Sequence, residues 1–410
     1  MPKTICIITP GIIASNPRVV KEAEALSGAG YRVHLIYTRH VNYLVESDDA
    51  ILKAHPEWKA EYLDWSVPGF RSKAIKYFSG MKKRLAEFIQ KTNLYPVQLA
   101  PFLINRFYFW QLNKAIACKA DLYIAHYPDC LGIAYKAAKV NKAFFAYDAE
   151  DYHRGEYLPE FVLRIIQEIE DSVLPHANYI SAASPLIAEE YRKLFPNVAV
   201  VNIENMFAGK NQPDFQKITD DVIKFFWFSQ TIGPFRGLEE FISILGQTNK
   251  RNVSLSLLGN VSETYSQELN NCWAKAGLTP GLLVFIETVP EKEIFKIAGY
   301  HHFGLCLEIP IVLNRDICIT NKLYTYILSG NFLILSNTRA QKNFHTSNPQ
   351  TGICFDLKNT KQAVEMLHEV LNNPAAINKA REFNYILGQS KLNFDQEKQI
   401  LIKQVNSLWD

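Results

Sequence analysis

Apolar residues in the first half of the chain form short, nearly continuous runs that alternate with amphipathic segments. The strands predicted from the continuous runs are 4–10, 31–38, 120–127, 143–149 and 177–184. The helices predicted where apolar residues recur every three to four positions are 17–30, 129–140 and 160–173. Continuous apolar strands separated by helices indicate a parallel sheet covered on both faces. Right-handed crossovers then give a doubly wound, Rossmann-like domain.

A polar stretch, AGKNQPDFQKITDDV over 208–222, follows this domain and suits an interdomain linker. The alternation then restarts. The second set of predicted strands is 223–229, 253–258, 282–286, 303–307 and 332–336. The second set of predicted helices is 237–248, 263–276, 291–298 and 321–329. The fold class predicted is therefore α/β with two Rossmann-like domains, and the cleft between two such domains is the expected ligand site.

The domains predicted are 1–207 and 223–387, followed by helix over 388–410. A chain of 410 residues with 48% hydrophobic and 21% charged residues is of ordinary globular composition. The net charge of +3 is too small to argue for nucleic acid, and no nucleic-acid partner is expected.

Seven scattered cysteines without a C-x-x-C pair favour reduced thiols in a cytoplasmic protein. The apolar N-terminal run is interrupted by Pro10 and Gly11, so it is predicted to be a first strand rather than a signal peptide. No run approaches the roughly 20 apolar residues that span a bilayer. The predicted location is cytoplasmic, at most peripheral on the inner face of the plasma membrane.

One segment departs from the alternating pattern. RSKAIKYFSGMKKRLAEFIQK, residues 71–91, places seven Lys or Arg and one Glu among apolar residues at helical spacing, and 101–110 is dense in aromatic residues. A basic amphipathic helix of this kind can lie on anionic lipid. The region 71–110 is therefore a candidate membrane-surface contact; an ordinary domain helix with a solvated basic face is the alternative.

Several polar residues of the first half follow predicted strands at the sheet edge where doubly wound folds bind ligands. Gly11 lets a ligand approach the backbone, and His126 ends a strand. Asp148 and Glu150 lie in an acidic segment that also holds His153, and could bind sugar hydroxyls or move a proton. A structural histidine and helix-capping carboxylates are the alternatives.

Arg18 and Lys21, three positions apart on the first predicted helix, are most simply solvated surface cations. No H-E-x-x-H or D-x-D pattern appears, and the G-x-x-x-x-G pattern around Gly233 lacks the Lys-Ser/Thr of a P-loop. Neither a metal ion nor a cofactor is expected.

Two strand-to-helix junctions of the second half suit a diphosphate. Residues 225–245 pass through a Gly-containing loop that carries Arg236, and residues 318–336 enter a helix near Lys322. Helix N-termini present unsatisfied N–H donors and the positive end of a dipole, and each cation adds a full charge.

The chain resembles the two-Rossmann (GT-B) glycosyltransferases, most closely the retaining enzymes of family 4. NPRVVKEAEALSGAGYRVHLIYT is similar to that group's first helix and second strand, and AHYPD and FAYDAEDYH are similar to its H-x-x-D and Y-D-x-H-E segments. Arg236-Gly237 matches the family's Lys-Gly or Arg-Gly phosphate motif, and ITNKLYTYILSG matches N-K-L-[FY]-E-Y.

The resemblance implies a GT-B fold in which the C-terminal helix crosses back to the first domain. The residues it places at the donor are Gly11, Ser229, Gln230, Gly233, Arg236, Asn321, Lys322, Leu323 and Thr325. The family commonly has Arg at the position of Gln230 and a ribose-binding Glu at that of Thr325, and Glu308 and Asp316 are candidates for its other acidic position.

The predicted function is metal-independent, retaining transfer of a hexosyl group from a nucleotide-diphosphate sugar to a saccharide or lipid-linked acceptor. Bacterial surface polysaccharide or glycoconjugate synthesis is the expected setting. Arg236 and Lys322 would stabilise the leaving diphosphate, while His126, Asp148 and Glu150 would act on the acceptor side. Two alternatives stay open: a nucleotide-sugar epimerase on the same fold, and a non-catalytic scaffold with a degenerate donor site.

Overall fold

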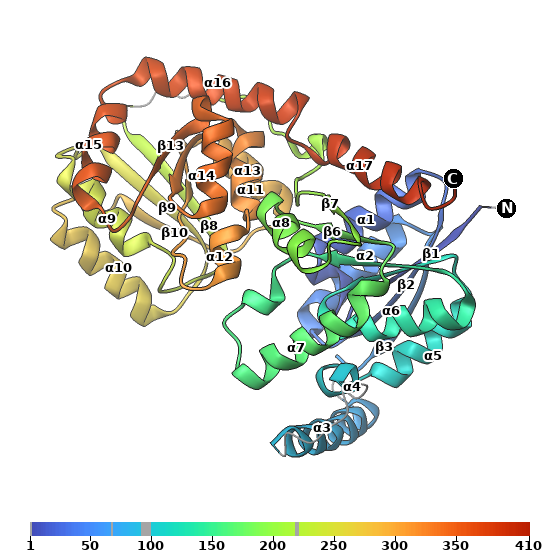
Figure 1. Ribbon diagram of the computed structural model, residues 1–410. Coiled ribbons are helices and arrows are strands. Elements are labelled where there is room, and N and C mark those ends of the chain that lie inside the picture. Colours follow the sequence, from blue (N-terminus) through green and yellow to red (C-terminus); the bar gives the residue numbers. More distant parts are fainter. Residues whose placement is uncertain (1, 67–68, 92–99, 218–220) are drawn as a thin grey trace. The chain divides into compact units, whose positions relative to one another are not determined.

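The computed structural model describes residues 2–66, 69–91, 100–217 and 221–410. The chain forms two compact units, and Figure 1 shows a parallel sheet with packed helices in each of them. Unit 1 comprises Met1–Glu204 with Lys398–Asp410, and unit 2 comprises Asn205–Glu397. The predicted class of two Rossmann-like α/β domains is confirmed. The predicted linker over 208–222 lies inside unit 2, and its residues 218–220 lie outside the described part.

The sheet of unit 1 has seven parallel strands in the order β3-β2-β1-β4-β5-β6-β7. The strands are β1 (Thr4–Ile8), β2 (Arg32–Arg39), β3 (Lys59–Asp64), β4 (Leu122–His126), β5 (Phe144–Ala149), β6 (Tyr179–Ala182) and β7 (Ala199–Asn202). The edge strands β3 and β7 were not predicted. Neither contains a fully buried residue, so neither carries the continuous apolar run that marked the inner strands.

The helices of unit 1 connect and cover these strands. They are α1 (Pro17–Gly28), α2 (Val45–Ala54), α3 (Phe70–Lys91), α4 (Ala100–Ile104), α5 (Tyr108–Cys118), α6 (Pro128–Asn141), α7 (Glu160–Val173) and α8 (Pro185–Leu194). Helix α1 begins where the sequence predicts, because Pro17 occupies its first position. The Asn16 side chain caps it by accepting from the backbone N–H groups of Arg18 and Val19.

The sheet of unit 2 has six parallel strands in the order β10-β9-β8-β11-β12-β13. The strands are β8 (Ile223–Ile232), β9 (Val253–Val261), β10 (Leu283–Ile286), β11 (Phe303–Cys306), β12 (Phe332–Ser336) and β13 (Gly352–Phe355). Trp227, Leu255, Leu305 and Ile334 are fully buried in the core of this unit.

The helices of unit 2 are α9 (Leu238–Gln247), α10 (Glu263–Lys275), α11 (Glu291–Gly299), α12 (Leu313–Ile317), α13 (Asn321–Ser329), α14 (Arg339–Ser347), α15 (Thr360–Leu371) and α16 (Pro374–Ser390). Helix α13 packs closely on β11. The Cβ of any residue replacing Gly304 would lie 2.2 Å from the ring of Tyr326, whose hydroxyl donates to the carbonyl of Phe226 at 3.1 Å.

The last helix, α17 (Phe394–Asn406), begins in unit 2 and ends in unit 1. The Phe394 N–H donates to the carbonyl of Phe207 in unit 2. Tyr31 of unit 1 donates its hydroxyl to Asn406 at 2.5 Å and accepts from the indole N–H of Trp409 at 3.1 Å. The C-terminal residues therefore complete the surface of unit 1.

Replacement of Gly304 by Ala should destabilise unit 2 by about 1–3 kcal/mol, because the hydrogen-bonded Tyr326 ring cannot yield to a new methyl group without losing its partner. Urea unfolding measures the effect. Gly299→Ala is the matched control, since its Cβ would meet only ordinary contacts at 3.7 Å or more. Equal stability of the two variants would contradict the packing described here.

Candidate functional site

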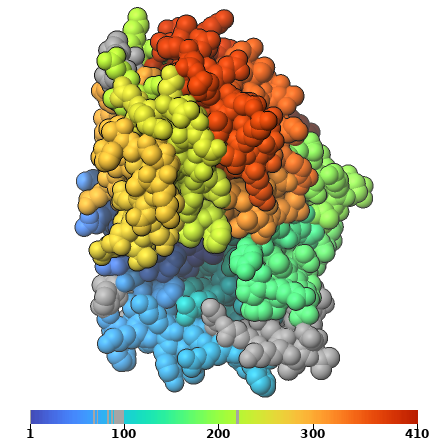
Figure 2. All heavy atoms as spheres, turned by 90° about the vertical axis from the view of Figure 1, so that its left-hand side faces the viewer, coloured from blue at the N-terminus to red at the C-terminus, as the bar shows by residue number. Residues whose placement is uncertain are grey.

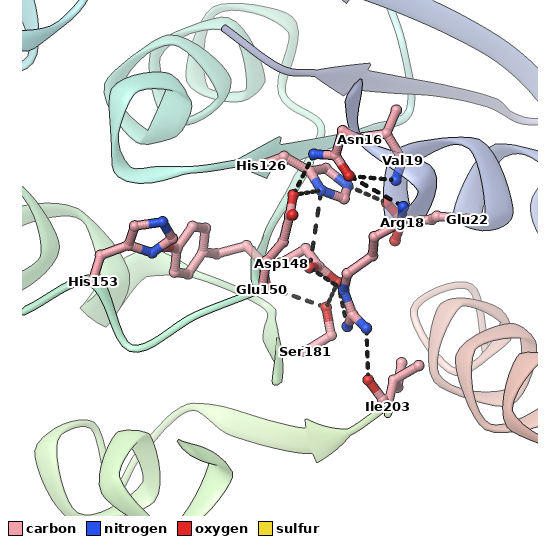
Figure 3. Close-up of polar contacts among 11 residues, drawn as sticks. Asn16, Arg18, Val19, Glu22, His126, Asp148, Glu150, His153, Ser181 and Ile203 are labelled. Carbon is pink, nitrogen blue, oxygen red and sulfur yellow. Dashed lines mark hydrogen bonds and ion pairs between the residues drawn. The ribbon is translucent and has the colours of Figure 1, made fainter. Parts of the chain in front are cut away.

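The strand order of unit 1 reverses between β1 and β4, and ligands of doubly wound sheets bind beside the carboxyl ends of strands at such a point. His126 ends β4, and Asp148 lies opposite it in the register of β5. Glu150 follows β5 directly. Figure 3 shows these three predicted residues gathered with Arg18 and Glu22 of α1.

Arg18 is the cation of this cluster. Its Nε and one terminal nitrogen donate to the two carboxylate oxygens of Asp148 at 2.6 and 2.8 Å, and its other terminal nitrogen donates to the carbonyl of Ile203 at 2.8 Å. Ser181 of β6 donates its hydroxyl to Asp148 at 2.7 Å. The expectation that Arg18 is a solvated surface residue is wrong: it is only 6% exposed, because its partner lies on the neighbouring sheet edge.

His126 is enclosed between two carboxylates. One ring nitrogen lies 2.6 Å from Glu22 Oε2 and the other lies 2.8 Å from Glu150 Oε1. Burial alone would lower the pKa of His126, but the charges of Glu22 and Asp148 and the hydrogen bond to Glu150 raise it to about 10. The imidazole is therefore a cation at neutral pH, with both N–H groups donating.

Arg18 and the imidazolium also set the protonation of the carboxylates. Burial opposes ionisation of Asp148, but the adjacent guanidinium and imidazolium outweigh it and hold the pKa of Asp148 below its usual value. Burial raises the pKa of Glu22, against the attraction of His126. At neutral pH the two cations offset charge on the surrounding acids.

The network defines what each predicted residue can do. His126 has no exposed surface and both its nitrogens are paired, so it can orient Glu150 but cannot itself contact a ligand in this arrangement. The Glu150 side chain is 12% exposed and also accepts from Asn16 at 2.6 Å. Glu150 is therefore the member of the cluster that reaches the surface.

One atom from each of His126, Asp148 and Glu150 lies within 4.8 Å of the others, which is a spacing that could hold a metal ion. The donor set argues against one, because Arg18 already binds both oxygens of Asp148 and His126 is protonated. A divalent cation would have to displace two positive charges.

Two further residues of unit 1 lie at this edge. Gly11 follows β1 and is half-buried, and a Cβ there would meet the ring of His40 at 3.5 Å. Tyr127, directly after β4, adopts a positive φ of 66°, and its ring packs edge-on against His153 with centroids 5.3 Å apart.

The strand order of unit 2 reverses between β8 and β11, so the corresponding edge holds the loop 233–237 and the residues that follow Cys306. Gly237 caps α9 with φ of 78°, and a Cβ there would lie 2.7 Å from Leu357 and 3.2 Å from Leu307. The loop therefore packs against the end of β11, which requires glycine at this position.

Arg236 lies in this loop, directly before the start of α9, and is half-buried. Within the part of the chain that the structure describes, its guanidinium makes no hydrogen bond or ion pair. The other predicted residues of this segment lie on the last residues of β8 and after it: Ser229 is half-buried, Gln230 is exposed, and Gly233 has open space around its missing side chain. The loop thus presents one uncompensated positive charge.

Lys322 lies in the first turn of α13. Unlike the charge of Arg236, its charge is paired. Its ammonium is 3.0 Å from Glu308 Oε1, and it lies over the ring of Trp227 at 5.4 Å from the centroid. Both side chains of the pair are nearly buried, with 9% and 3% exposed. Glu308 follows β11, so the pair joins the end of that strand to the start of α13.

The remaining predicted residues of α13 have different exposures. Asn321 is half-buried at the first helical position, whereas Leu323 and Thr325 are buried. The Thr325 hydroxyl donates to the carbonyl of Asn321 at 3.1 Å, within the helix. Asp316, the other acidic candidate, pairs with Arg339 at 2.5 Å.

No protein-family model matches the chain, and no curated protein matches its sequence. Solved structures match along its whole length. The chain has the GT-B fold. Anabaena HepE in complex with UDP and glucose is 10% identical with a TM-score of 0.68, covering 99% of this chain and 100% of that chain. Sucrose-phosphate synthase from Thermosynechococcus elongatus is 12% identical with a TM-score of 0.70, covering 99% of each chain.

A third neighbour is a mutant of S. aureus TarM in complex with fondaparinux, alpha-GlcNAc-glycerol and UDP. It is 9% identical with a TM-score of 0.66, and the match covers 98% of this chain and 100% of that chain. At these identities the GT-B likeness concerns the arrangement of strands and helices alone.

The proton on His126 should make the stability of the protein depend on pH. Folded His126 keeps its proton to about pH 10, whereas an unfolded histidine loses it near pH 6.5. The contribution is complete below the unfolded pKa and is lost as the pH rises through the folded one. Between them the free energy of unfolding should fall by about 1.4 kcal/mol per pH unit from this group.

In His126→Gln this component of the slope should vanish, and the variant should be less stable by about 3–5 kcal/mol near pH 7 because Glu22 and Glu150 lose their cation. Urea unfolding across this pH range measures both effects. His368→Gln in unit 2 is the control, since among the described residues that ring makes a hydrogen bond only with the carbonyl of Thr248 and no ion pair. An unchanged slope in His126→Gln would show that the histidine is neutral.

Proposed function

We propose that this protein is a glycosyltransferase that moves a sugar from a nucleotide-diphosphate donor to a saccharide or lipid-linked acceptor. The observation that carries the proposal is the half-buried Arg236, which has no partner among the described residues and lies where the strand order of unit 2 reverses. A cation left uncompensated at a ligand-binding edge suits an anionic ligand, and a diphosphate supplies matching oxygens. HepE and TarM, which share the fold, have structures containing UDP.

In this proposal the diphosphate is the leaving group, and negative charge grows on it as the bond to the sugar breaks. Arg236 would stabilise that charge more strongly in the transition state than in the bound donor, which raises the rate rather than only the affinity. The first N–H groups of α13 have no partner within the helix and would add donors at the same edge.

Lys322 would contribute through its ion pair. A donor that approached the ammonium would share it with Glu308, so Lys322 would supply a partly neutralised charge unless the pair opened. Arg236 is therefore the main electrostatic group in the proposal. The Thr325 hydroxyl, bonded within its helix, would contribute an acceptor lone pair at most, and Asn321 is the more accessible polar group of this turn.

The acceptor would bind to unit 1 through Glu150, the surface member of the charged cluster, with His126 and Asp148 holding it in position. Oriented carboxylates bind sugar hydroxyls and can accept their protons. We propose that the reaction proceeds with retention and without a metal ion, in the synthesis of a surface polysaccharide or glycoconjugate.

Helix α3 supports a membrane-bound acceptor. Among the side chains of this helix that the structure describes, six large apolar ones are exposed, Phe70 at 91% and five others: Tyr77, Phe78, Met81, Leu85 and Phe88. Helical geometry places these six positions within about 100° of arc, and Lys73 and Arg84 lie along one side of it. Figure 2 shows parts of α3 in light blue at the surface.

We infer that this face lies on an anionic lipid surface near the acceptor, where each cation contributes about 1 kcal/mol. The predicted contact region 71–110 falls partly outside the described residues, at 92–99. In the part that is described, none of the helices combines the length and hydrophobicity needed to cross a bilayer.

Arg236→Ala should abolish most transfer while leaving the fold intact, because its guanidinium makes no hydrogen bond or ion pair among the described residues. We expect a loss of about 100-fold or more in kcat, comparable to removal of one oxyanion donor. A panel of nucleotide-diphosphate sugars is first screened by thermal shift, and products are then identified by mass spectrometry. Arg236→Lys should keep part of the activity, since it keeps the charge but loses the bidentate geometry.

Lys275→Ala, which removes an exposed cation from α10, is the control and should behave as the wild type. Undiminished turnover by Arg236→Ala would remove the leaving-group role. Absence of thermal protection by every nucleoside diphosphate would instead favour a non-catalytic scaffold, since a ligand at a hundredfold excess over Kd stabilises a protein by about 2.7 kcal/mol.

A double variant, Phe78→Ser with Leu85→Ser, should reduce flotation with vesicles that contain anionic phosphatidylglycerol by at least about tenfold, since it removes two of the exposed apolar groups. Binding to purely zwitterionic vesicles should be weak for both proteins. The matched control is Ile386→Ser, which removes an exposed apolar residue from α16 of unit 2. Equal flotation of the double variant and the wild type would exclude α3 as the lipid contact.

A further inference from the structure

A second cluster of reactive groups lies on the face of the unit 1 sheet that α5 covers, apart from the charged network at the strand ends. Cys6 of β1 and His34 of β2 are direct neighbours in the parallel register. Cys118, the last residue of α5, places its Sγ 2.8 Å from His34 Nδ1. Cys6 and Cys118 thus both adjoin His34, and each thiol perturbs the pKa of the other.

The far side of His34 faces a carboxylate. His34 Nε2 lies 3.2 Å from Glu61 Oε1, close enough for an ion pair although it is not aligned for a hydrogen bond. Lys114 of α5 holds the other oxygen of Glu61 at 2.5 Å, and Lys59 lies 3.7 Å from Glu61. Cys118, His34 and Glu61 thus form a thiol–imidazole–carboxylate row in which the histidine can accept the thiol proton.

We propose that Cys118 is a reactive thiolate and that Cys6 is its resolving partner, so that a hydroperoxide converts the pair to a Cys6–Cys118 disulfide. The two cysteines differ in the way this role requires, since Cys118 is half-buried and open to a small oxidant, whereas Cys6 is fully buried. Cys118 therefore meets the peroxide first.

The charges around the two sulfur atoms agree with this division. The neighbouring Cys6 thiol and the hydrogen-bonded His34 ring, together with the charges of His34 and Lys59, lower the pKa of Cys118 to about 5 despite its partial burial. Burial and the adjacent Cys118 raise the pKa of Cys6 well above its usual value. Tyr123 is a further ionisable group near both sulfur atoms, and its hydroxyl donates to the carbonyl of Ala115 at 3.0 Å.

The reaction balances in two steps. The Cys118 thiolate attacks the hydroperoxide, an S–O bond forms, the O–O bond breaks, and the leaving oxygen takes a proton to give water or an alcohol. The Cys6 thiol then loses its proton and attacks the Cys118 sulfur, so that an S–S bond forms and hydroxide leaves with that proton as water. Two thiols are oxidised by two electrons in total, and the peroxide is reduced.

Metal binding is the other chemistry that cysteine and histidine suggest. Among the described residues, however, these three side chains do not bring one ligand atom each within 4.8 Å of the others, because only the His126 cluster meets that criterion. A zinc or copper site would need such convergence. The arrangement therefore favours thiol chemistry.

The test uses the full-length protein and two reagents. Iodoacetamide at about pH 6, read by peptide mass spectrometry, should label Cys118 at least about tenfold faster than Cys354, which is also half-buried but has its pKa raised to about 11. His34→Gln should slow labelling of Cys118 while leaving Cys354 unchanged. Labelling of both cysteines at equal rates would overturn the assignment of Cys118 as a thiolate.

Hydrogen peroxide with the wild-type protein should then produce one cross-linked peptide that joins Cys6 to Cys118, reversible by dithiothreitol. In Cys6→Ser the sulfenic acid of Cys118 should persist and react with dimedone, and in Cys118→Ser neither product should form. Peroxide treatment that yields no Cys6–Cys118 peptide, whatever the alkylation result, overturns the proposed pair. Circular dichroism of each variant separates loss of chemistry from loss of fold.

Discussion

The ion pair between Arg18 and Asp148 is the interaction on which the functional edge of unit 1 depends. Through it the first turn of α1 binds β5, and its further hydrogen bonds reach Ser181 of β6 and the carbonyl that follows β7. His126 extends the network to β4. Because Arg18, Asp148 and His126 are buried and each charge is offset by another, the network acts as a unit: removal of one charge leaves its partner uncompensated in a medium of low polarity.

The same position in unit 2 is built differently. Lys322 and Glu308 neutralise each other at the start of α13, but Arg236 has no such partner within the described part of the chain. The charged residues at the two sheet edges are therefore paired differently. Unit 1 uses buried charges to hold a carboxylate at the surface, and in unit 2 the guanidinium of Arg236 has no partner among the described residues. This asymmetry is the physical basis for the proposal that unit 2 binds the anionic donor.

The sequence predicted the inner strands and most helices because their burial produces a readable pattern; α7, α13 and β12 have the predicted bounds of 160–173, 321–329 and 332–336. It did not predict the edge strands β3, β7 and β13, which lack that pattern. The prediction that Arg18 is a solvated surface cation was also wrong. Arg18 and Glu22 share the buried stripe of α1 with Val19 and Leu26, and two charges in an apolar stripe were the available signal.

The sequence did not predict which residues, distant along the chain, pair with each other in the fold. Lys322 and Glu308 lie 3.0 Å apart, yet nothing in their local spacing distinguishes this contact from exposure of both side chains to a ligand. The same holds for Cys6 and Cys118, whose proximity depends on how α5 packs on β1. The type of residue at a site is therefore readable from the chain, whereas its state of charge and its partner follow only from the folded arrangement.

The division of α17 between the two units has a consequence for biosynthesis. Unit 2 is continuous in sequence, but unit 1 receives Asn406 and Trp409 only after the whole of unit 2 has been translated. At about 5–20 residues per second, roughly 200 residues separate the emergence of β7 from that of the last helix, a delay of about 10–40 s. During that interval Tyr31 and Phe144 lack Trp409, whose indole N–H donates to Tyr31 and whose ring packs edge-on against Phe144 with centroids 4.9 Å apart, so the N-terminal unit is synthesised before these contacts can form.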